Sequence, residues 1–235
     1  MPTMLLVLAT TFGFCLLAMA KPGPPAPLVF YASQSGKSTL DQGEGGGNPF
    51  ASALVELLGR QSLTYIELRA GLVALTKEKS RGFQVPECPT VIEPADWRLK
   101  PIPVSAKRVA LVVVYSDYRN TGMSSLPGAK RDLERVATAL RKAGFDVNAI
   151  ANPSRNTLQA ALDEISRASK GADAALVYMT GHGFEHHGHV YLRPNDYPVG
   201  ARVFPERAVH VPSLAGYLKA EKANLVLFGG CRSYN

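Results

Sequence analysis

Residues 174–183, Ala-Ala-Leu-Val-Tyr-Met-Thr-Gly-His-Gly, constrain the fold of this chain more than any other stretch. A run of apolar and β-branched residues that ends at a glycine is typical of a strand buried on both faces of a parallel sheet. Glycines on both sides of His182 let the backbone come close to a ligand, because no Cβ obstructs it. We therefore expect a central strand that carries His182 at its end.

A second apolar run, residues 224–228, ends in Gly229-Gly230-Cys231-Arg232. Parallel strands end at the same edge of a sheet, and open α/β sheets bind ligands beyond that carboxyl edge. If the two runs are parallel neighbours, His182 and Cys231 lie at the same edge. The sequence thus predicts a thiol–imidazole site.

The C-terminal part of the chain, residues 107–235, alternates strand and helix patterns in the manner of a parallel sheet. Besides the two strands above, we expect strands at 108–115 and 145–150, helices at 126–143, 154–168 and 211–220, and a hairpin through 188–192.

The N-terminal part, residues 26–86, predicts a strand at 28–32, a polar glycine-rich loop at 33–48, helices from Pro49 and over 63–79, and a short strand at 83–85. Asn48 is a good N-cap for the first helix, and Pro49 suits its first turn. Gly36-Lys37-Ser38 is not a phosphate-binding loop, because Tyr31 stands where that motif needs a glycine. The Pro-rich residues 87–106 are interpreted as a linker, and the two parts as one domain over 26–235.

Residues 1–20 have the pattern of a signal peptide, with an apolar run followed by Ala18-Met19-Ala20. This predicts a secreted or periplasmic protein. The alternative is an uncleaved segment that anchors the chain to a membrane, and only in that case do we expect a membrane partner.

Composition excludes some partners. The formal charge is +7, but no Lys/Arg run is long enough for a nucleic-acid tract. A disulfide between Cys88 and Cys231 is an alternative in an oxidising compartment. The Pro-rich context of Cys88 and the strand-end position of Cys231 argue against it.

Three histidines, His186, His187 and His189, follow His182 closely, with Glu185 as the nearby carboxylate. They fall on the predicted hairpin without a second ligand pair at metal spacing. We therefore expect no metal site.

Several segments of the C-terminal part carry a family resemblance. They are residues 108–113, the helix with Asp132, Gly144-Phe145, residues 180–183, residues 191–196 and Gly230-Cys231-Arg232. They resemble the large subunit of caspase-family cysteine peptidases, above all prokaryotic caspase-like proteins and metacaspases. A Cys followed by Arg, with a His about fifty residues upstream, matches the family's spacing.

The N-terminal part resembles the caspase small subunit in Phe30-Tyr31-Ala32, Gly36, Leu40-Asp41, Asn48-Pro49-Phe50, Ala53-Leu54 and residues 84–86. In that family the small subunit follows the catalytic Cys, whereas here it comes first. The resemblance implies a circularly permuted, three-layer α/β/α caspase-like fold with a six-stranded, mainly parallel sheet.

The resemblance also implies roles for single residues. Cys231 would be the nucleophile and His182 its acid–base partner. The backbone N–H groups of Gly183 and Cys231 would form the oxyanion hole, and Arg232 would add positive potential beside the sulfur. The implied activity is that of a thiol protease acting on proteins or peptides. Calcium dependence occurs in the family, but no residue pattern here identifies a cofactor, and nothing indicates an oligomeric state.

Specificity is the main departure from the family pattern. Metacaspases and many bacterial relatives carry an Asp two positions before the Cys, where this chain has Gly229. Asp132, Asp41 and Glu44 are the remaining carboxylates that could line the pocket. The resemblance implies weak cleavage after Arg or Lys and none after Asp.

Two other functions stay open at this point. A pseudo-peptidase that serves as a binding or scaffold module would explain a pocket relaxed by Gly229. A gingipain- or legumain-like peptidase would share the His-Gly…Cys pattern, but not the small-subunit features.

Overall fold

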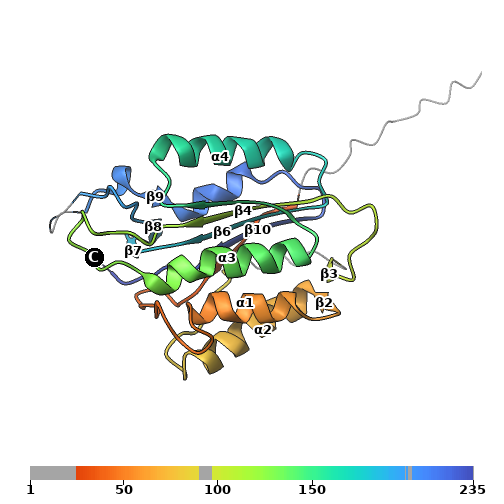
Figure 1. The fold of residues 1–235 in the computed structure, drawn as a ribbon, viewed down its shortest axis with the longest axis horizontal. Helices are drawn as coiled ribbons and strands as arrows, with labels where there is room; N and C mark the ends of the chain where they lie inside the picture. Colours follow the sequence, from red (N-terminus) through yellow and green to blue (C-terminus); the bar gives the residue numbers. More distant parts are fainter. Residues whose placement is uncertain (1–24, 90–96, 199, 201–202, 235) are drawn as a thin grey trace, which may run out of the picture.

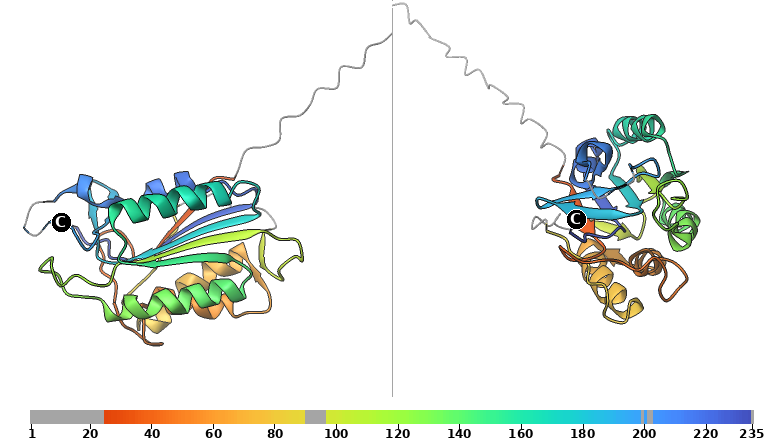
Figure 2. Two further views of the ribbon diagram at one scale, coloured as in Figure 1. Left: turned by 45° about the horizontal axis from the view of Figure 1, so that its top comes forward. Right: turned by 90° about the vertical axis from the view of Figure 1, so that its left-hand side faces the viewer.

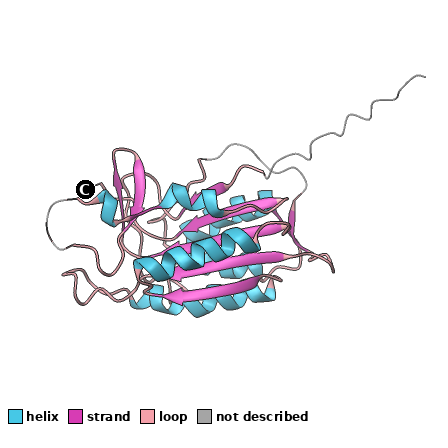
Figure 3. Ribbon diagram, turned by 90° about the horizontal axis from the view of Figure 1, so that it is seen from above, coloured by secondary structure: helices cyan, strands magenta, loops and turns pink. Residues whose placement is uncertain are grey.

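A parallel sheet organises the computed structural model, which describes residues 25–89, 97–198, 200 and 203–234. Within these residues the sheet has five strands. In spatial order they are β1 (Leu28–Tyr31), β10 (Ala223–Phe228), β6 (Ala174–Thr180), β4 (Arg108–Val114) and β5 (Asp146–Ala151). All neighbours pair in parallel, so their carboxyl ends point the same way (Figure 3). The strand that precedes His182 and the strand that precedes Cys231 are direct neighbours, as predicted.

Helices cover both faces of this sheet, which confirms the expected three layers (Figures 1 and 2). One face carries α1 (Pro49–Leu58), α2 (Tyr65–Lys79) and α3 (Pro127–Lys142), and the other carries α4 (Arg155–Ala168) and the 3₁₀ helix η2 (Val211–Tyr217). Strands β4, β6 and β10 are buried along their whole length, since side chains of both faces meet a helical layer. This explains why they read as continuous apolar runs.

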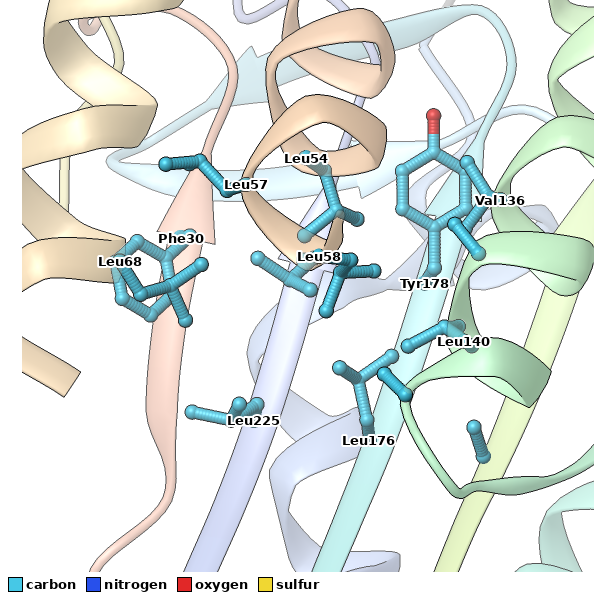
Figure 4. Close-up of a cluster of buried hydrophobic side chains, with 14 of the residues drawn as sticks. Phe30, Leu54, Leu57, Leu58, Leu68, Val136, Leu140, Leu176, Tyr178 and Leu225 are labelled. Atoms are coloured by element: carbon cyan, nitrogen blue, oxygen red, sulfur yellow. The ribbon is translucent and has the colours of Figure 1, made fainter. Parts of the chain in front are cut away.

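The larger core joins the two parts of the chain. Phe30, Leu54 and Leu57 from the N-terminal part pack in one buried cluster with Val136 and Leu225 from the C-terminal part (Figure 4). Burying each such side chain contributes about 1.5–3 kcal/mol. Strand β1 pairs with β10 in the register Leu28↔Leu225, so the strand predicted at 28–32 is confirmed, and it lies beside the Cys strand.

The expected sixth strand is wrong for residues 83–85, which form none. Among the described residues, one antiparallel bridge continues the sheet beyond β1, where Tyr31 and Glu87 exchange backbone hydrogen bonds of 2.8 and 2.9 Å. Residues 83 and 84 do not extend this bridge into a strand, because the N–H groups of Phe83 and Gln84 donate to the Ser80 carbonyl and hydroxyl oxygens over 3.1 and 2.8 Å. Position 87 therefore holds the edge of the sheet with a single bridge.

The predicted linker contains ordered structure on its far side. Strand β3 (Arg98–Lys100) pairs antiparallel with β2 (Leu63–Thr64), and Trp97 and Leu99 belong to the main core. Thr64 also caps α2 through a capping box with Glu67, so the predicted helix over 63–79 begins at Tyr65.

The hairpin after the His strand is confirmed as β7 (Gly183–His186) and β8 (His189–Leu192). Strand β9 (Val209–His210), preceded by the 3₁₀ turn η1 (Pro205–Arg207), pairs with β8. The predicted helix over 211–220 is the 3₁₀ segment η2, and Gly216 within it disfavours a longer α-helix. The predicted signal peptide lies outside the described residues. In the described ranges, no helix is long and apolar enough to cross a membrane.

Candidate functional site

His182 and Cys231 lie on adjoining loops at the carboxyl edge of the sheet. The loops follow β6 and β10, which are in register at Met179↔Phe228, and the Gly229 N–H donates to the Met179 carbonyl over 2.9 Å. A Cβ on Gly183 would lie 2.3 Å from the Cys231 carbonyl oxygen, so the two loops can touch only because residue 183 is glycine. His182 and Cys231 are both partly exposed.

His182 is held at three points. Its backbone N–H donates to Tyr118 Oη over 3.0 Å, and the Tyr118 ring meets the imidazole edge to face at 4.5 Å. The third contact joins Nε2 to the Ser124 carbonyl oxygen over 2.7 Å. A carbonyl only accepts, so Nε2 carries the proton and Nδ1 is the nitrogen that can exchange one.

Tyr118 and Ser124 were missed from the sequence. They belong to the loop between β4 and α3, which ends at the same sheet edge. The one sequence signal that could have identified them is their position in the loop that follows a buried strand. The Tyr118 hydroxyl also donates to the Arg193 carbonyl over 2.8 Å. It therefore connects His182 and Arg193, the residues just before β7 and just after β8.

The Cys231 sulfur has a partner from the N-terminal part. The Thr39 N–H lies 3.2 Å from Sγ, and the Thr39 hydroxyl oxygen lies 3.3 Å from it. Thr39 belongs to the glycine-rich loop between β1 and α1, and sequence reasoning did not single it out. Cys231 and Cys88 do not form a disulfide with each other, and Cys88 packs against the main core instead.

Arg232 does not present an uncompensated charge to the sulfur. Its buried guanidinium pairs with Glu185, at 3.1 Å from Nη2 to Oε2, and with Glu87. It also stacks over the Tyr31 ring, with Cζ 4.5 Å from the ring centre. The expected positive potential is therefore offset by two carboxylates, and Arg232 instead ties the end of β10 to the N-terminal part.

Asp132 is fully buried on α3. Its Oδ2 accepts the Asn48 N–H over 2.9 Å, and its Oδ1 pairs with Arg135 at 2.8 Å. Burial raises the pKa of Asp132 to about 6, although the Asn48 and Arg135 contacts act in the opposite direction. The Asn48 side-chain amide donates to the Gly229 carbonyl over 3.0 Å. Asn48 therefore connects Asp132 to the loop that carries Cys231.

The space beside Gly229 is filled. A Cβ there would lie 2.8 Å from Thr180 Oγ1 and 3.0 Å from Tyr178 Oη. Among the described residues, the buried Tyr178 hydroxyl has no hydrogen-bond partner. Burial, and then the nearby Asp132 carboxylate, raise the pKa of Tyr178. Polar groups of β6 thus occupy the place that a side chain at position 229 would need.

Asp41 binds the N-terminus of α3. Its two carboxylate oxygens accept the N–H groups of Gly128 and Ala129, each over 2.8 Å. This interaction caps a helix whose own N-cap residue, Leu126, offers no side-chain acceptor. Asp41 is thus engaged in the fold, and the Glu44 side chain is exposed on the same loop.

The histidines of the hairpin do not gather around a common point. His189 Nδ1 lies 3.2 Å from His210 Nε2, while the His186 and His187 rings contact each other. Within the described ranges, no group of three or more His, Cys, Asp or Glu side chains could hold a metal ion.

Comparison with known proteins identifies the family. The caspase domain family matches residues 107–234, which is more than half of the chain and includes Asp132, His182 and Cys231. No curated protein matches the chain significantly. The match agrees with the α/β architecture and with the resemblance of the C-terminal part to the caspase large subunit. The chain belongs to the caspase domain family of cysteine peptidases.

Proposed function

We propose that this protein is an active cysteine endopeptidase of caspase type, with Cys231 as nucleophile and His182 as acid–base partner. One observation carries the proposal: Cys231 and His182 lie on loops that follow neighbouring strands, and Gly183 contacts the Cys231 backbone. The Ser124 carbonyl supports the roles, because it leaves Nδ1 of His182 for proton transfer.

In the proposed reaction the Cys231 thiol first gives its proton to Nδ1 of His182. The thiolate attacks the scissile carbonyl carbon, and the C=O electrons move onto oxygen. The backbone N–H groups of Gly183 and Cys231 stabilise this oxyanion, by about 3 kcal/mol per donor. The imidazolium then protonates the leaving amine as the C–N bond breaks. A water molecule, deprotonated by His182, hydrolyses the resulting thioester and restores the thiol.

For specificity we propose cleavage after Arg or Lys, with Asp132 as the carboxylate that recognises the basic side chain. A buried cation needs a counter-charge, and both oxygens of Asp41 are already bound to α3. Asp132 is paired with Arg135, so a substrate cation has to share or replace that partner. This competition predicts weak cleavage.

We also propose that the chain is a circular permutation of the family's order and that residues 1–20 direct its export. The placement of β1 beside β10 supports the permutation, because the N-terminal part supplies the strand next to the Cys strand. Proteins or peptides are the proposed substrates.

A fluorogenic peptide library varied at P1, the residue before the cut, tests the activity. We expect wild type and Cys88→Ala to cleave after Arg or Lys, Cys231→Ala to be inactive, and Asp132→Ala to lose the basic preference. Cleavage after Asp would contradict the specificity. No turnover of any peptide, together with an unreactive Cys231, would favour the pseudo-peptidase.

A further inference from the structure

Two polar groups of Thr39 contact the Cys231 sulfur. The backbone N–H and the side-chain hydroxyl lie 3.2 and 3.3 Å from Sγ. The N–H can only donate, whereas the hydroxyl can donate to the sulfur or accept from a neutral thiol, with the Gly229 carbonyl 3.5 Å away as its other acceptor. The Thr39 carbonyl, a further acceptor for a neutral thiol, lies at 3.9 Å. A thiolate only accepts, so once the sulfur is ionised the N–H and the hydroxyl can both donate to it.

The chain on both sides of Thr39 is anchored. The Leu40 N–H donates to Gln84 Oε1 over 2.9 Å, and the Gln84 side chain is fully buried. On the other side, the Lys37 carbonyl accepts the N–H of Arg232 over 2.8 Å. The second anchor joins Lys37 to the residue that follows Cys231. Thr39 is therefore held against the sulfur by bonds that do not involve its own side chain.

We propose that Thr39 stabilises the thiolate of Cys231 and is a third catalytic group, supplied by the N-terminal part of the chain. The inference rests on Cys231 being the nucleophile. Hydrogen bonds to the charged form of an acid favour that form, and bonds to an ionised acceptor are about twice as strong as neutral ones. When the thiol passes its proton to His182, the sulfur gains the negative charge that both Thr39 donors face.

The chemistry predicts two opposite effects when the hydroxyl is lost. At neutral pH a smaller fraction of the sulfur is thiolate, so alkylation slows. At high pH every molecule is thiolate, and a thiolate with fewer hydrogen bonds is the stronger nucleophile, so the plateau rate is equal or higher. A residue that merely covers the sulfur would instead slow alkylation at every pH.

The test measures the rate of iodoacetamide labelling of Cys231 against pH, by peptide mass spectrometry on the full chain. Thr39→Val removes the hydroxyl at nearly constant shape. We expect the midpoint of its rate profile to move up by about one pH unit. Thr39→Ser should restore the wild-type midpoint. Ser38→Ala, which removes an exposed hydroxyl one residue away, should leave it unchanged.

A thermal melt of each variant separates a local effect from unfolding. If Thr39→Val does not fold, Thr39→Ala takes its place, and we expect the same shift of the midpoint for it. An unshifted midpoint in the folded variant, or an equal shift in Thr39→Ser, overturns the proposal. The assay needs no substrate. If no peptide is cleaved and the shift appears, the proposed function fails, and only the stabilisation of the Cys231 thiolate by Thr39 stands. If peptides are cleaved and no shift appears, the proposed function stands and this inference fails.

Discussion

The backbone N–H of Asn48 donates to the carboxylate of Asp132 across 2.9 Å, where no part of Asp132 is exposed to solvent. This bond joins the start of α1 to α3, and it places the N-terminal part against the carboxylate proposed to select a basic residue. Because the pKa of Asp132 is raised to about 6, its charge costs folding free energy at neutral pH.

Asp132 therefore predicts a pH dependence of stability. Its ordinary pKa is 3.8, so between pH 4 and 6 the folded state binds more protons than the unfolded state, and stability falls as pH rises. The free energy of unfolding of wild type, relative to Asp132→Asn, should decrease by about 2 kcal/mol from pH 4 to 7. Urea denaturation across that range measures the difference.

Asp117→Asn is the control for Asp132. Asp117 is exposed, and its hydrogen bonds with Arg119 lower its pKa to about 2. Asp117 is ionised in both the folded and the unfolded state above pH 5. The difference in unfolding free energy between Asp117→Asn and wild type should therefore stay constant between pH 5 and 7. If the Asp132→Asn difference is also flat, or rises with pH, the assignment of a raised pKa is wrong.

Tyr118→Phe tests how His182 is positioned. The change leaves the His182 N–H and the Arg193 carbonyl without their shared partner. We expect a loss of about 1–3 kcal/mol in unfolding free energy. The displaced imidazole should lower kcat about ten- to a hundredfold, with a smaller change in KM.

Tyr217→Phe provides the comparison, because the Tyr217 hydroxyl contacts Gln159 at an exposed position. That variant should keep its stability and its activity. Equal kcat values for Tyr118→Phe and wild type would show that Tyr118 has no part in setting the imidazole.

Several site features could be predicted from the sequence because their signals are local. The strands before His182 and Cys231 are continuous apolar runs, and Asn48 is the N-cap of α1 as its type and position indicated. The sixth strand predicted at 83–85 did not form, because the N–H groups of Phe83 and Gln84 are bonded to Ser80 just after α2. In each case the outcome depended on residues close together in the chain.

Contacts between distant loops could not be read from the sequence. Thr39 reaches Cys231 across 192 positions, and Asp41 caps α3 across 87. Neither residue type is unusual in a polar loop, so nothing in the pattern distinguishes them. The predicted effect of the Arg232 charge on the Cys231 sulfur was wrong for the same reason. The carboxylates that offset this charge, Glu185 and Glu87, come from segments far from Arg232 in the sequence.

Arg232→Met should destabilise the fold strongly. It leaves Glu185, which is 5% exposed, without its counter-charge. Removing one partner of a buried ion pair costs about 3–5 kcal/mol. Adding Glu185→Gln should recover part of that loss, because the orphaned charge is then gone. Urea denaturation of the single and double variants measures both effects.

Arg119→Met is the matched control, since Arg119 forms an exposed pair with Asp117 and should cause no measurable loss. If Arg232→Met is as stable as Arg119→Met, the buried pair of Arg232 with Glu185 does not stabilise the fold.

The two cysteines should differ in reactivity. Cys231 lies beside the Thr39 donors at the sheet edge, whereas Cys88 packs against the core near the Tyr65 hydroxyl. Thiol reactivity follows thiolate fraction and access. In native protein near neutral pH, iodoacetamide should label Cys231 far faster than Cys88, as quantified by peptide mapping. Equal rates, or a disulfide between them, would remove Cys231 as nucleophile.

The N-terminal part of the chain packs into the same core as the C-terminal part. If they form one domain, cutting the chain between them should not separate them, because β1 pairs with β10 and α1 packs on α3. The buried cluster of Phe30, Leu54 and Leu225 also spans the cut. A site for a specific protease, inserted within residues 90–96, allows the cut, and the uncut insertion variant is the control. Gel filtration should show both pieces eluting together at the size of the intact protein, and Cys231 should keep its labelling rate. The contrary result is that the two pieces elute separately and that each has its own cooperative unfolding transition. The N-terminal part would then be an independent domain, and the permuted single domain would be wrong.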